Sequence, residues 1–162
     1  MKTNTILIAI AALAVARIGF AQAPASGPTH SVIAPDAIVW GPAPPALPAG
    51  AQMAILSGDP RQAGPFTVRV RMPAAYTIPP HWHPAAEHLT ILAGEAAVGM
   101  GDAIDTAAMQ AMKAGAFAVM APEMRHYLRA KAETTVQVHG TGPFTITYVN
   151  PRDDPRNAAS SR

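Results

Sequence analysis

The stretch from His81 to Gly94 constrains the fold of this chain most, because it places two imidazoles and a carboxylate within seven residues. His81 and His83 stand two positions apart. Successive side chains of an extended strand alternate between its faces, so both rings point the same way. Pro84 then turns the chain, and Glu87 opens a run typical of the next strand. The pattern predicts neighbouring strands whose side chains converge on one point.

Two histidines and one glutamate that converge in this way are typical ligands of a divalent transition metal. A further ligand must come from elsewhere, and His126 is the best candidate because it begins a short predicted strand after Gly115 and Pro122. Three imidazoles and one carboxylate leave about two positions of an octahedron for water, dioxygen or a substrate oxygen. The ion could be Fe(II), Mn(II), Ni(II), Cu(II) or Zn(II). The alternative is that these are surface or core histidines that bind no metal.

Composition favours a single domain of short strands. The chain has 162 residues, of which 49% are hydrophobic and only 14% are charged, so it can bury a core. Its 17 prolines and 12 glycines favour many turns over long helices. It contains no cysteine, which excludes a disulfide framework and thiolate chemistry.

The first 21 residues are typical of a signal peptide. Lys2 precedes an unbroken apolar run, Ile6 to Ala16, which is too short to span a bilayer comfortably. We expect cleavage after Ala21 and a periplasmic or secreted protein that begins at Gln22; an uncleaved anchor is the alternative, because Arg17 ends the apolar run. Cleavage lowers Lys+Arg from 12 to 10, equal to the 10 Asp+Glu. The mature chain is then neutral, with no nucleic-acid signal and no membrane contact.

Turn signals divide the rest of the chain into an arm, one domain and a tail. Residues 22–50 form an arm rich in Pro and Ala, in which only residues 38–40 suggest a short edge strand. Residues 51–150 form one all-β domain, and residues 151–162 form a charged tail that frays. The strands predicted in the domain are 52–56, 66–72, 87–92, 96–100, 116–120, 126–130, 134–139 and 144–149, while 103–114 is ambiguous between a short helix and a loop.

The spacing of the ligand candidates resembles that of the cupin family. The first cupin motif has a His-x-His pair, three residues, Glu, six residues and Gly. His81, His83, Glu87 and Gly94 match it at every position.

The second cupin motif is matched in part. Gly115 and His126 stand at the right separation, while Ala121 takes the place of its proline, Glu123 of its second glycine and Ala130 of its asparagine. The resemblance implies a double-stranded β-helix, the jelly-roll barrel, which is often a homodimer. It also implies that one divalent ion is held at the barrel mouth by His81, His83, Glu87 and His126.

Two other histidines of the domain need separate interpretations. His88 follows Glu87 on a strand and therefore points to the opposite face, toward the surface or an interface. His139 shares one face of its strand with Gln137. If that face lines the barrel, His139 is our candidate catalytic residue, as a proton donor or a hydrogen-bond partner near the metal. Otherwise it is a strand-end histidine that bonds to the following turn.

Two functions remain open. The first is a metal-dependent enzyme that acts on a small organic molecule by oxygenase-, isomerase- or lyase-type chemistry, all of which occur on cupins. The second is a barrel that binds or senses a small ligand without turnover, which the short chain and its few polar residues favour. A purely structural metal site is the weakest hypothesis, because structural zinc sites are usually closed and rich in sulfur.

Overall fold

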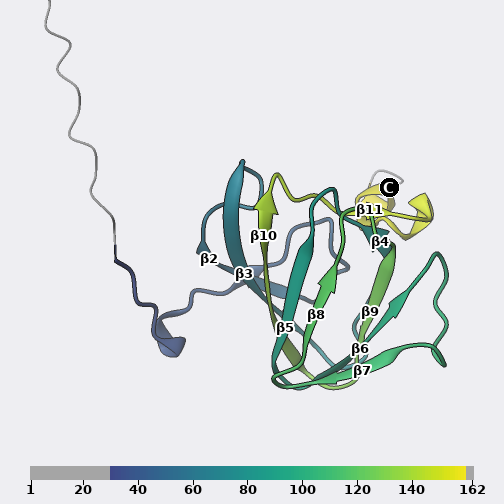
Figure 1. Ribbon diagram of the computed structural model, residues 1–162, viewed down its shortest axis with the longest axis horizontal. Helices are drawn as coiled ribbons and strands as arrows, with labels where there is room; N and C mark the ends of the chain where they lie inside the picture. The colour runs from purple at the N-terminus through teal and green to yellow at the C-terminus, as the bar shows by residue number, and fades with distance from the viewer. Residues whose placement is uncertain (1–29, 160–162) are drawn as a thin grey trace, which may run out of the picture. The chain divides into compact units, whose positions relative to one another are not determined.

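The computed structural model describes residues 30–159, which contain two antiparallel β-sheets (Figure 1). The chain divides into two compact units, residues 1–32 and 33–162, and both sheets belong to the second unit. The predicted signal peptide, residues 1–21, lies outside the described residues. No helix within residues 30–159 is long and apolar enough to cross a membrane.

The two sheets have six and five strands. The first sheet contains, in spatial order, β1 (Gly41–Pro42), β2 (Gln52–Ser57), β3 (Gly64–Met72), β10 (Thr134–Gly142), β5 (Glu87–Ala93) and β8 (Phe117–Met120). The second contains β11 (Thr147–Tyr148), β4 (Thr77–Trp82), β9 (His126–Ala130), β6 (Glu95–Met100) and β7 (Gln110–Lys113). The chain crosses between the sheets after β3, β4, β5, β7, β8, β9 and β10. This confirms the predicted all-β jelly roll.

The hydrophobic core lies between the facing sides of the two sheets. Along β3 burial alternates as predicted, with Phe66, Val68 and Val70 buried and the residues between them partly exposed. The opposite sheet contributes Val98 and Leu128 to the same core. Burial of each such side chain stabilises the fold by about 1.5–3 kcal/mol.

Several elements differ from the sequence prediction. Residues 38–40, expected as an edge strand, form no strand, and the two-residue β1 begins directly after them. Residues 101–109 form turns without a helix, and β7 follows them. Strand β11 occupies only two of the positions predicted at 144–149. Strand β4 was not predicted because it contains Pro79 and Pro80, which lack the N–H that a ladder needs; accordingly its register with β9 shifts there.

The last residues of the predicted arm contact the barrel. The hydroxyl of Tyr76 donates to the carbonyl of Pro48, and that of Tyr148 donates to the carbonyl of Ala46 at 2.7 Å. Burial raises the pKa of Tyr76 to about 12, so this hydroxyl keeps its proton. Residues 33–50 belong to the same compact unit as the predicted domain.

Short helices occupy most of the described part of the tail. These helices are η2 (Pro151–Asp153) and α1 (Pro155–Ala159). A third short helix, η1 (Pro35–Ala37), lies near the start of the unit. The guanidinium of Arg156 donates to the carbonyl of Ile146 at 3.1 Å and so ties α1 to the chain ahead of β11.

Candidate metal centre

The structure brings together the four side chains that the sequence singled out as metal ligands. One ligand-type atom from each of His81, His83, Glu87 and His126 lies within 4.8 Å of the others. All four are buried, with exposed fractions between 3% and 7%. They stand at strand ends: His81 is next to last in β4, while Glu87 and His126 begin β5 and β9. The cluster therefore lies at one end of the barrel.

Sheet register explains how residues far apart in sequence meet here. His126 lies directly opposite His81 in the β4–β9 pair, and their ring centroids are 4.2 Å apart. Glu87 belongs to the other sheet, where it is opposite Met120. Residues 83–86 carry the chain from one sheet to the other. An ion held by the cluster would therefore connect the two sheets.

The three imidazoles share one kind of anchor, because the Nδ1 atom of each lies 2.8 Å from a backbone carbonyl oxygen. The carbonyls are those of Pro79 for His81, Thr145 for His83 and Met124 for His126. A carbonyl oxygen can only accept a hydrogen bond, so each Nδ1 donates, and a neutral ring then keeps its lone pair on Nε2. Anchors of this kind set the tautomer and orientation of metal-binding histidines.

The contacts of Glu87 show that the donor set fits a cation. Its Oε2 atom lies 3.0 Å from Nε2 of His126 and 3.4 Å from Nε2 of His83. Because Nδ1 already donates, Nε2 of a neutral ring is an acceptor. Two acceptors repel at this distance unless positive charge lies between them. A second proton on the ring or a metal ion supplies that charge.

The protonation states of the cluster also suit metal binding. Burial, with the neighbouring rings of His126 and His83, lowers the pKa of His81 to about 3, so His81 is neutral at neutral pH. Burial by itself would raise the pKa of Glu87, but the imidazoles of His126 and His83 beside it outweigh burial and hold that pKa well below its usual range. Neutral imidazole and ionised carboxylate are the forms that ligate metals.

The match to known proteins agrees with the fold and with this cluster. Residues 28–145, more than half of the chain, match the family model of the ChrR cupin-like domain. The chain belongs to this cupin family. No curated protein matches the sequence.

Solved structures share the fold at low sequence identity. A candidate acetylacetone dioxygenase from Methylibium petroleiphilum PM1 has a TM-score of 0.61 and 18% identity, over 85% of this chain and 99% of that chain. KdgF from a Halomonas species has a TM-score of 0.54 and 15% identity, over 70% and 96%. A cupin-superfamily sugar phosphate isomerase from Silicibacter pomeroyi has a TM-score of 0.54 and 19% identity, over 73% and 81%. These identities show the fold alone.

The segment before β11 supports the cupin cluster in a way that sequence reasoning missed. The ring of Phe144 stacks on His83 with centroids 4.1 Å apart and planes 19° apart. The next residue, Thr145, supplies the carbonyl that anchors the same imidazole at 2.8 Å. Phe144 lies outside both cupin motifs, and a backbone carbonyl carries no sequence signal, so neither contact could be found from spacing.

The departures from the second cupin motif leave its turn intact. Glu123, which stands in the second glycine position, has φ 61° and so adopts the left-handed conformation that glycine adopts freely. Its backbone N–H donates to the carbonyl of His83 at 2.8 Å. The turn therefore connects the loop after β8 to the His-x-His segment, and His126 reaches the cluster in spite of the substitution.

The structure places His139 away from the cluster, which corrects its assignment as a catalytic candidate. Val136 and Val138 are the buried residues of that part of β10, so the face that carries Gln137 and His139 is the outer one. The condition under which His139 would act on the metal or substrate is not met. Strand β10 also continues past His139 to Gly142, so no turn follows it. His88 points outward, as predicted.

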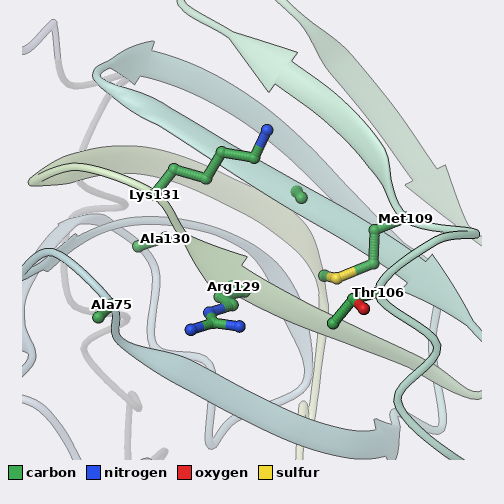
Figure 2. A pocket seen from close by; sticks show the side chains of 7 residues that line it. Ala75, Thr106, Met109, Arg129, Ala130 and Lys131 are labelled. Carbon is green, nitrogen blue, oxygen red and sulfur yellow. The ribbon is translucent and has the colours of Figure 1, made fainter.

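A hollow on the outside of the second sheet is separate from the cluster. It encloses about 350 Å³, and none of the four cluster residues lines it. Figure 2 shows that Arg129 and Lys131 reach into it from the end of β9, while Thr106 and Met109 border it from the turns before β7. Lys131 also pairs with Glu95 at 3.1 Å. The polar side chains here, those of Thr106, Arg129 and Lys131, are exposed and differ from the buried donors of the cluster.

Proposed function

We propose that this cupin binds a divalent transition metal through His81, His83, Glu87 and His126 and catalyses an oxygenase-type reaction on a small uncharged organic molecule. The observation that carries the proposal is the cluster of three carbonyl-anchored imidazoles around one carboxylate. When bound, such an ion supplies Lewis acidity and, for a redox-active metal, dioxygen chemistry.

The other buried side chains support an uncharged substrate. Within residues 30–159, the buried polar or charged side chains are the four cluster residues and Thr134. Thr134 is already engaged, because its hydroxyl donates to the carbonyl of Glu95 at 2.9 Å. The described interior thus contains no buried Lys or Arg that could bind a carboxylate or phosphate of a substrate. Burying such an anionic group without a partner costs free energy.

The same inventory favours oxygenase chemistry over isomerase or lyase chemistry. Isomerisation and elimination usually need a positioned acid or base that is free to exchange a proton. In the described interior the buried histidine and glutamate side chains are the proposed ligands themselves. The other buried titratable groups, the hydroxyls of Tyr76, Tyr127 and Tyr148, donate to backbone carbonyls. The chain's own contribution is then to hold the donors, exclude water with apolar side chains and leave coordination positions open. The Methylibium protein, named for a dioxygenase of a small diketone, suggests the first substrate class to test.

Anaerobic loading with Fe(II), followed by measurement of oxygen uptake, tests this proposal. The panel should pair neutral β-diketones and phenols with small carboxylic acids and sugar phosphates. We expect uptake with a neutral compound, loss of uptake in His81→Ala, and full uptake in Glu133→Gln, which removes an exposed carboxylate. Uptake only with a charged compound would contradict the substrate class.

Capture of a small ligand without turnover is the second candidate function. It is favoured by the burial of the four donors and by the lack, among the described residues, of a buried carboxylate or imidazole beyond those four. Stoichiometric metal with tight binding of a panel compound, but no oxygen uptake with any metal, would support it over the enzyme.

We also propose that the chain is exported, on the basis of its first 21 residues. Mass spectrometry of the protein from the periplasm or medium should give a mature N-terminus at Gln22. An intact Met1 in that fraction would contradict the cleavage.

A further inference from the structure

Two histidines face each other on the outer side of the first sheet. His88 on β5 and His139 on β10 are directly opposite in the antiparallel register. Their ring centroids lie 4.9 Å apart with an angle of 23° between the planes. Both side chains are partly exposed. Neighbouring strands therefore present two imidazoles side by side to solvent.

The ring nitrogens of this outer pair have no protein partner in the described part of the chain. Neither ring takes part in a hydrogen bond or ion pair there; each makes ring contacts only. The row across the sheet continues with Thr67 beside His139 and Val119 beside His88. The row contains no carboxylate to bind the rings and no ammonium or guanidinium to repel a cation.

We propose that His88 and His139 form a second divalent-metal site on the surface of the barrel, with Cu(II) as its preferred ion. Side chains directly opposite in an antiparallel pair have Cβ atoms about 4.5–5.5 Å apart, close enough for two imidazoles to share one ion after a rotation of each ring. Imidazole suits late first-row metals, and Cu(II) binds nitrogen donors most tightly among them. Water completes the coordination.

The local surroundings favour binding of an ion over a purely structural role for the pair. Phe117, whose ring centroid is 6.1 Å from that of His88, and Val119 are both exposed on β8 beside it. They add no charged group beside His88, and both histidines stay accessible to solvent. This site is independent of the proposed function, because it shares no ligand with the buried cluster.

Titration with Cu(II) after saturation with Zn(II) tests the outer site. Zinc kept in large excess over copper holds the buried cluster against displacement, and the paramagnetic copper then broadens amide signals near the site that it occupies in a ¹H–¹⁵N spectrum. We expect broadening at Thr67, Val119 and His139 at the first additions, with Trp82 and Tyr127 on the other sheet unaffected. Broadening confined to Trp82 and Tyr127 would mean that copper entered the cluster, and it would overturn the proposal.

Variants of the two outer histidines complete the test. His139→Gln and His88→Gln should each weaken Cu(II) binding by at least about tenfold, because a chelating second ligand acts at high effective concentration. His30→Ala, which removes one exposed histidine near the N-terminus, should leave it unchanged. The comparison uses whichever glutamine variant keeps the wild-type amide spectrum. Copper affinity equal to wild type in that variant, or no copper binding by the Zn(II)-loaded wild type, would overturn the proposal.

Discussion

The buried cluster and the outer pair meet at the first sheet, where Glu87 of the cluster and His88 of the outer pair are consecutive residues of β5 and point to opposite faces. The buried rings are each anchored through Nδ1 to a carbonyl. The outer rings rest only on each other and on Phe117. The number of histidines therefore matters less for a metal site than the anchoring of each ring before the ion arrives.

This difference has an energetic consequence. Immobilising a side chain on binding costs about 0.5–1.5 kcal/mol in free energy. The anchored rings are already immobile in the folded protein, so ion binding does not incur this cost for them. The outer rings must be ordered when the ion binds. The cluster also adds a carboxylate, whose charge acts in a poorly solvated site. We therefore expect the cluster to bind a given divalent ion far more tightly than the outer pair.

We expect the largest effect from a substitution that disrupts the cluster and leaves the outer pair intact. Glu87→Gln removes the carboxylate and should weaken Zn(II) binding at the cluster by more than about 100-fold, since even loss of a group that only supports a ligand costs about 10–100-fold. Competition with a chromophoric chelator measures the affinity. Glu133→Gln is the matched control, and wild-type affinity in Glu87→Gln would remove that residue from the ligand set.

The next effect is on the stability of the fold. The cluster draws donors from both sheets, so its ion stabilises the folded barrel over the unfolded chain. At a free Zn(II) concentration 100 times the dissociation constant we expect a gain of about 2.7 kcal/mol in the free energy of unfolding. Urea titration with Zn(II) and with a chelator measures it. In the Glu87→Gln variant the gain at the same Zn(II) concentration should disappear; if it persisted, the stabilising ion would lie elsewhere.

A smaller effect separates anchoring from ligation. Phe144→Ala removes the ring that stacks on His83, and aromatic pairs of this kind contribute about 0.5–1.5 kcal/mol beyond burial. We expect Zn(II) affinity at the cluster to fall by about tenfold or less and Cu(II) affinity at the outer pair to stay unchanged. Phe144→Leu, which keeps apolar contact without a flat ring, should give an intermediate affinity. Equal affinities in all three proteins would show that the stack does not orient His83.

The smallest effect concerns the turn that leads to His126. Glu123→Gly should raise the free energy of unfolding by less than about 1 kcal/mol, because it relieves a left-handed residue. Glu123→Ala keeps the strain and removes only the carboxylate, so it should show no gain. Urea unfolding of the metal-free proteins measures both. A gain in the alanine variant as well would assign the effect to charge instead of backbone strain.

Much of the fold and site could be predicted from local patterns. The alternation along residues 66–72 identified the buried face of β3, and the spacing from His81 to Glu87 identified most of the cluster. Strand β4 was not predicted because it contains two prolines, which are unusual in a strand that has a neighbour on both sides. The role of His139 depended on which face of β10 lines the barrel, and the alternation of Val136 and Val138 with it does not exclude either face by itself.

By itself, the sequence determined which side chains are donors and which neighbours share a strand face, because both follow from residue chemistry and a two-residue period. The tertiary structure decided the rest. Register set His126 against His81 and His88 against His139, and three backbone carbonyls oriented the buried rings. The register joins residues far apart in the chain, as does the Thr145 carbonyl that anchors His83, and any residue type can supply a backbone carbonyl.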